Sequence, residues 1–113
     1  MDATVRTRQV DSTTYRIALA GEFDMHTSPE FKHDLQTCIE HGAAEVIVDL
    51  SEASFIDSTF LGIVLGGRKH LRERGGEIRV LCPDSLRRIF EVTGLDRVLT
   101  IDKAPAPALE PAS

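Results

Sequence analysis

Hydrophobic and polar residues alternate near the start of the chain. Residues 4–10 and 14–23 have the sequences TVRTRQV and TYRIALAGEF, and Tyr15, Ile17 and Leu19 fall on one side of the second segment. Such alternation is typical of half-buried strands. Because the turn-forming residues 11–13 separate the two segments, the pattern predicts a β-hairpin.

The hydrophobic period then changes to that of a helix. Thr27 and Glu30 have the spacing of a capping box, while Ser28 followed by Pro29 suits an N-cap and a first helical residue equally well. Gly42 predicts the end of this helix. Its apolar face is formed by residues spaced i, i+4, i+7 and i+8, namely Phe31, Leu35, Cys38 and Ile39.

The segment EVIVDL, residues 45–50, is an almost unbroken apolar run rich in β-branched residues. It predicts a central, buried strand that is covered on most of both faces. The periodicity of the rest predicts, in order, a helix over 58–74, a strand over 77–82, a short amphipathic helix within 83–94 and a last strand over 97–101.

The resulting order, β-β-α-β-α-β-α-β, predicts the fold class. Strands that alternate with helices after an initial hairpin indicate an α/β domain, with helices packed on a mixed, mostly parallel sheet. We expect one domain over residues 1–102. Residues 103–113 are rich in proline and alanine and lack periodicity, which predicts a disordered tail.

Length and charge exclude several functions. A chain of 113 residues can bury one core without disulfides or metal. Its net charge of −5 argues against nucleic acid as a partner. The N-terminus lacks the pattern of a signal peptide, and the longest apolar run, FLGIVLGG, is too short to span a bilayer. We therefore expect a cytoplasmic protein that does not enter the membrane.

The sequence also gives little evidence for a metal site or a redox pair. Cys38 and Cys82 lack the spacing of a zinc site or a redox pair, so buried free thiols are expected. The four histidines form no metal-binding motif. We expect no metal and no cofactor.

The segment FIDSTFLGIVLGG, residues 55–67, places polar residues between a strand and a helix. Two interpretations are open. Asp57 or Ser58 caps the helix, or Ser58 is a switch whose phosphorylation would add roughly −1.5 to −2 charges beside Asp57 and disrupt a docked interface. An enzyme with Ser58 as nucleophile is not favoured, because the GxSxG elbow and an assignable histidine base are missing.

Three glycines lie in the helix that follows, at positions 62, 66 and 67. Each costs about 1 kcal/mol relative to alanine. Close packing against the sheet would compensate, so we expect Gly62, Gly66 or both to face the sheet at close range.

Three longer segments carry a family resemblance: GEFDMHTSPEF at 21–31, VIVDLSEASFIDSTFLGIVLGGRK at 46–69 and RRIFEVTGLDRVLTI at 87–101. Across residues 4–102 the chain resembles the STAS-domain anti-sigma factor antagonists (anti-anti-sigma factors) of bacteria. The resemblance implies that the hydroxyl after Asp57, on Ser58, is phosphorylated by the partner, an anti-sigma factor that is also a serine kinase using ATP and magnesium. Asp24 matches the aspartate of the family's GE-x-D motif, which lies near this site and helps partner binding.

The chain departs from the family pattern at Phe60, where D-S-T-G-L has glycine. Two placements are open: Phe60 is exposed beside Ser58 and alters which partner docks, or it packs against the strand end. The candidate partner-binding residues are therefore Asp24, Asp57, Ser58, Thr59 and Phe60.

The resemblance implies an anti-sigma factor antagonist rather than an enzyme. Its unphosphorylated form would bind the anti-sigma factor kinase and release a sigma factor, and phosphorylation of Ser58 would switch binding off. The alternative, favoured by Phe60, is a structural STAS subunit of a signalling scaffold or transporter-associated complex, without the switch. A monomer or weak dimer is expected, since hairpin edges can pair.

Overall fold

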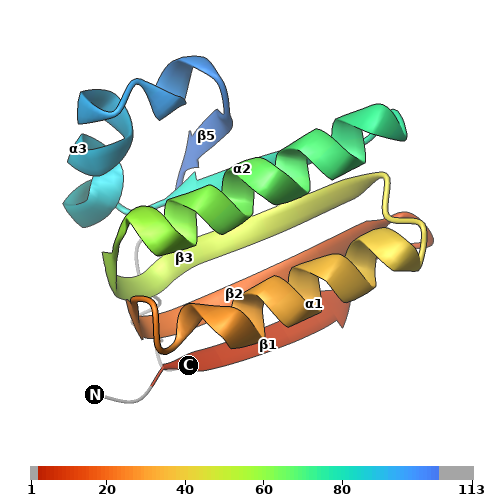
Figure 1. Ribbon diagram of the computed structural model, residues 1–113, viewed down its shortest axis with the longest axis horizontal. Coiled ribbons are helices and arrows are strands. Elements are labelled where there is room, and N and C mark those ends of the chain that lie inside the picture. The colour runs from red at the N-terminus through yellow and green to blue at the C-terminus, as the bar shows by residue number, and fades with distance from the viewer. Residues whose placement is uncertain (1–2, 105–113) are drawn as a thin grey trace, which may run out of the picture.

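The structure, a computed structural model, describes residues 3–104 (Figure 1). The chain order predicted from the sequence is confirmed. The elements are β1 (Thr4–Gln9), β2 (Thr14–Phe23), α1 (Ser28–Glu40), β3 (Glu45–Ile56), α2 (Ser58–Glu73), β4 (Glu77–Cys82), α3 (Asp84–Val92), a 3-10 turn (Leu95–Arg97) and β5 (Thr100–Lys103).

The strands form one mixed sheet in the order β1-β2-β3-β4-β5. Only β1 and β2 are antiparallel, as the hairpin requires, and β2 to β5 run parallel. Helices α1 and α2 lie side by side over one face, and α3 lies on the other side of α2 from α1 (Figure 1). The fold prediction is therefore confirmed, with β3 at the centre of the sheet.

The central strand is buried as predicted, but its two faces differ. Val46, Val48 and Leu50 have no exposed surface and belong to the core. Asp49 alternates with them, and its carboxylate accepts a hydrogen bond from Arg16 Nε at 3.1 Å. Burial raises the pKa of Asp49, but hydrogen bonds from Ser51 and Arg16 outweigh burial and hold that pKa below its usual value. The expectation of cover on most of both faces holds fully for one face only. On the other face Asp49 is buried, but Glu45 and Ile47 are partly exposed.

Strand boundaries near the C-terminus differ from the prediction. The segment 97–101 is not all strand, because Gly94 adopts a left-handed conformation (φ 76°) and starts the 3-10 turn. The amide of Leu99 then bonds to the carbonyl of Leu95 at 2.8 Å, and β5 begins only at Thr100. This strand reaches Lys103, the first residue assigned to the tail, and residues 105–113 lie outside the described residues.

Strand β3 is also longer than predicted. It continues for six residues past Leu50, because pairing with β2 goes on through two register shifts to Ile56. The hydrophobic pattern did not predict this extension, because residues 51–56 include several polar residues. The extension carries the chain to the start of α2.

The first helix begins where predicted but is capped differently. Thr27 occupies the N-cap position, yet its hydroxyl donates to the Glu22 carbonyl at 2.8 Å instead of capping the helix. The predicted capping box is therefore absent. Gly42 follows the helix with φ 86°, which confirms the predicted end.

Both cysteines are free and buried, as predicted. Burial raises the pKa of the Cys38 and Cys82 thiols to about 11. At neutral pH both are therefore protonated and poor nucleophiles.

The prediction that Gly62, Gly66 or both face the sheet at close range is wrong. A Cβ built on Gly62 or Gly66 meets nothing within 4 Å. A Cβ on Gly67 would lie 2.5 Å from Cδ2 of the buried Leu35. Gly67, at the contact between α1 and α2, is the glycine that close packing requires.

We expect Gly67→Leu to lower the free energy of unfolding by roughly 1 to 3 kcal/mol, because the new side chain overpacks the space beside Leu35 and Ile78. Gly62→Leu is the matched control and should not destabilise the domain, since its Cβ enters open space. Urea denaturation of both variants checks this. Equal midpoints for the two variants would contradict the packing described here.

Candidate functional site

The parallel register of β2 and β3 brings two loops to the same edge of the sheet. Phe23 and Ile56, the last residues of these strands, are paired partners. Asp24 and Asp57 come directly after them, and adjacent strands lie about 4.8 Å apart. The loop before α1 and the loop before α2 are therefore neighbours, at the left end of the sheet in Figure 1.

Asp57 is the N-cap of α2. Its backbone is extended, and its Oδ1 accepts a hydrogen bond from the amide of Phe60 at 3.1 Å. The capping interpretation therefore holds for Asp57 and not for Ser58.

Ser58 is the first residue of α2, and both Ser58 and Thr59 are exposed. Within residues 3–104 the Ser58 hydroxyl takes part in no hydrogen bond. It lies where a helix has unpaired N–H groups and a partial positive charge. The hydroxyl is thus accessible to a modifying enzyme, and the helix start would tolerate an added negative charge.

Asp24 organises the loop before α1. Its Oδ1 accepts hydrogen bonds from the amides of His26 at 2.8 Å and Thr27 at 3.1 Å. The hydrogen bond from the His26 amide, helped by Thr27, lowers the pKa of Asp24. Asp24 is therefore an ionised side chain that closes its own turn, beside the start of α2.

Phe60 is packed, which decides between its two placements. Its side chain has no exposed surface. The ring stacks on Phe31 with centroids 4.7 Å apart and contacts Phe23 at 5.9 Å. Of the two predicted placements, the structure shows the one in which Phe60 packs inside the domain. A buried ring cannot touch a partner directly, so the prediction of Phe60 as a direct contact residue is wrong. The ring instead connects the end of β2 with the first turns of α1 and α2.

Two exposed apolar side chains flank the site and were missed in the sequence. Met25 follows Asp24 and is 64% exposed, and Phe55, near the end of β3, is 47% exposed. Strict alternation from the buried Ala53 would turn Phe55 inward, but a register shift between these two residues, where β3 pairs with β2, turns Phe55 outward. The hydrophobic pattern therefore carried no signal for it. Large exposed apolar residues beside a candidate site are typical of protein interfaces.

This edge of the sheet presents two exposed hydroxyls, those of Ser58 and Thr59, beside the carboxylates of Asp57 and Asp24. Over residues 3–104, no three His, Cys, Asp or Glu side chains cluster in a way that could hold a metal ion.

No helix in the described part of the chain is long and apolar enough to cross a membrane.

Fold and site together define a small α/β domain with an exposed serine at a helix start. The chain matches the family described as "Mlab, STAS domain" over residues 6–101 and belongs to the STAS domain family.

Its relatives narrow the group to anti-sigma factor antagonists. The chain is 34% identical over 102 residues to the anti-sigma-B factor antagonist of Listeria monocytogenes, covering 89% of this chain and 90% of that protein. It is 31% identical over 99 residues to that of Staphylococcus aureus, covering 83% and 92%. The solved structure of the anti-sigma factor antagonist SpoIIAA in its unphosphorylated form is 26% identical, with a TM-score of 0.73 and coverage of 88% and 89%. The family recognised in the sequence is confirmed.

Proposed function

We propose that this protein is a phosphorylation-controlled antagonist of an anti-sigma factor. Unphosphorylated, it binds an anti-sigma factor that is also a serine kinase and so releases a sigma factor. Phosphorylation of Ser58 ends the binding. The observation that carries the proposal is the exposed Ser58 at the start of α2, with its helix already capped by Asp57.

Electrostatics supports a switch at this position. A phosphate adds roughly −1.5 to −2 charges. The carboxylates of Asp57 and Asp24 already lie on the same edge of the sheet. Within a desolvated interface the added charge would repel these groups, while the start of α2 itself would accommodate it. The phosphorylated protein would therefore stay folded and lose its partner.

This role assigns different tasks to the kinase and to this chain. The kinase would bind ATP and magnesium, and this chain would supply the acceptor hydroxyl, so it acts as a binding protein and not as an enzyme. We also propose that it works in the cytoplasm as a monomer or weak dimer. The names of its relatives, antagonists of anti-sigma factors, support a protein partner.

The alternative of an unswitched STAS subunit depended on Phe60. An exposed aromatic ring beside Ser58 would have changed the surface that a kinase meets. Because Phe60 is buried, Ser58 and Thr59 remain accessible and that reason for the alternative is removed.

The direct experiment is phosphate transfer. The purified protein is incubated with ATP, magnesium and the purified anti-sigma factor kinase, and the modified residue is mapped by mass spectrometry. One phosphate on Ser58 is expected. Phosphate on Thr59 instead, or on neither residue, would contradict the proposed switch.

Phe55→Ala is expected to weaken binding to the anti-sigma factor about tenfold or more, because exposed aromatic side chains near the centre of an interface often dominate its energy. Calorimetric titration measures the effect. Val10→Ala is the matched control: Val10 is 49% exposed but follows β1 at the opposite end of the sheet. Equal losses in the two variants would show that Phe55 is not part of the interface.

A further inference from the structure

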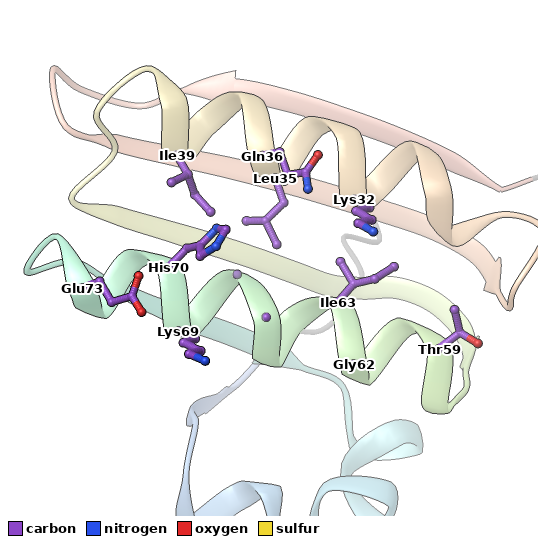
Figure 2. Close-up of a pocket in the computed structure, with 12 residues that line it drawn as sticks. Lys32, Leu35, Gln36, Ile39, Thr59, Gly62, Ile63, Lys69, His70 and Glu73 are labelled. Carbon is purple, nitrogen blue, oxygen red and sulfur yellow. The ribbon is translucent and has the colours of Figure 1, made fainter.

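An open groove runs between α1 and α2 on the helical face of the domain (Figure 2). Its volume is about 520 Å³. Leu35 and Ile39 of α1 face Ile63 of α2 across it (Figure 2). Along α2 the lining residues run from Thr59 to Glu73, a length of about 21 Å at 1.5 Å per residue.

The glycines of α2 form part of the groove surface. Gly62 and Gly66 line it, one helical turn apart, and a Cβ on either would enter open space. Glycine is the least favourable helix residue after proline, and among residues 3–104 no packing neighbour lies within 4 Å of a Cβ built on either glycine. Gly67 differs, because Leu35 fills the space beside it. Packing within the domain therefore explains Gly67 but not the other two.

The rim of the groove is basic, although the chain as a whole has a net charge of −5. Lys32 extends from α1, while Lys69 and His70 extend from α2, and Glu73 is the one acidic side chain that lines this groove. Within residues 3–104 neither lysine forms an ion pair. The groove thus combines apolar walls with uncompensated positive charge, which complements an acidic, amphipathic segment.

We propose that the groove between α1 and α2 docks an acidic amphipathic helix of the anti-sigma factor. Its length suits three to four helical turns. The missing side chains at Gly62 and Gly66 would let the partner backbone approach α2 closely. Thr59 lines the end of the groove next to Ser58, so this contact would extend the surface around the phosphorylation site. The inference rests on the proposed function, because it assigns the groove to the same partner.

The first test fills the groove. Gly62→Leu should reduce the affinity for the purified anti-sigma factor at least tenfold in a calorimetric titration. It should not lower the thermal unfolding midpoint, because in the described part of the chain its Cβ meets no packing neighbour within 4 Å. The control, Glu40→Leu, adds the same side chain at an exposed position of α1 that does not line the groove, and should bind like wild type.

The second test changes the charge of the rim and leaves the groove open. Lys69→Glu should weaken binding about tenfold at low salt, and the loss should shrink as salt is added. The control, Arg8→Glu, makes the same change of two charge units on the exposed edge strand β1, where little effect is expected.

The outcomes separate this inference from the proposed function. If Ser58→Asp abolishes binding while Gly62→Leu and Lys69→Glu bind like wild type, the groove is not part of the interface and the inference fails alone. If the wild-type protein does not bind the anti-sigma factor, the proposed function fails and the inference fails with it. If Gly62→Leu changes only the sedimentation of the free protein, the occupant is a second copy of this chain and the inference is overturned.

Discussion

Ser58→Asp is expected to weaken binding to the anti-sigma factor about a hundredfold or more, which corresponds to about 2.8 kcal/mol at 1.4 kcal/mol per decade. The permanent carboxylate would lie next to Asp57 and on the same edge as Asp24. In a contact that excludes water, such like charges are repelled and lose hydration. The domain itself should remain folded, because Ser58 is exposed and the start of a helix favours negative charge.

The companion variant Ser58→Ala removes the hydroxyl without adding a charge. It should bind the anti-sigma factor like wild type, since the hydroxyl takes part in no hydrogen bond within residues 3–104. It should also resist phosphorylation, because the acceptor oxygen is gone. Thr59→Ala, a change of the neighbouring exposed hydroxyl, should matter less for phosphate transfer, because the Ser58 hydroxyl is kept.

Calorimetric titration and mass spectrometry measure these two properties. Tight binding by Ser58→Asp would rule out a charge-based switch at this residue. Transfer of phosphate to Ser58→Ala at the wild-type rate would place the acceptor elsewhere.

The elements of this fold were predictable where one face of a segment is apolar. The stripe that includes Phe31 and Leu35 identified α1, and the run around Val48 identified the central strand, because burial of those faces determines both. Boundaries set by hydrogen bonding were not predictable in the same way. The extension of β3 to Ile56 depends on pairing with β2, and the delay of β5 depends on the left-handed Gly94.

The site was partly predictable for a related reason. Asp57 and Ser58 stand between a strand and a helix, so their place at the edge of the sheet followed from the order of elements. The direction in which each side chain points did not follow from the order of elements. The sequence could not show that Gly67, and not Gly62, meets Leu35, because this depends on how α2 is rotated against α1. The same holds for Phe60, which turns inward, and for Phe55, which turns outward.

Phe60→Gly restores the residue that the family pattern has at this position, yet we expect it to lower the free energy of unfolding by roughly 4 to 6 kcal/mol. Removing a buried phenylalanine side chain costs about 3 to 5 kcal/mol, and glycine in a helix costs about 1 kcal/mol more. The ring fills the space between Phe23 and Phe31, so its loss leaves a cavity where β2, α1 and α2 meet. A domain with a total stability of about 5 to 15 kcal/mol would be close to unfolding after such a change.

Urea denaturation checks this, with Phe60→Leu as the conservative variant and Phe55→Ala as the matched exposed aromatic. Phe60→Leu should lose less than half as much stability, because leucine keeps most of the apolar contact. Phe55→Ala should leave the midpoint nearly unchanged, since Phe55 is 47% exposed. Binding is then measured at low temperature, where the variants remain folded. Loss of binding by Phe60→Gly with an unchanged urea midpoint would place the ring in the interface. A lower midpoint with partial loss of binding would instead mean that Phe60 supports binding indirectly, because its ring holds the starts of α1 and α2 together beside Ser58.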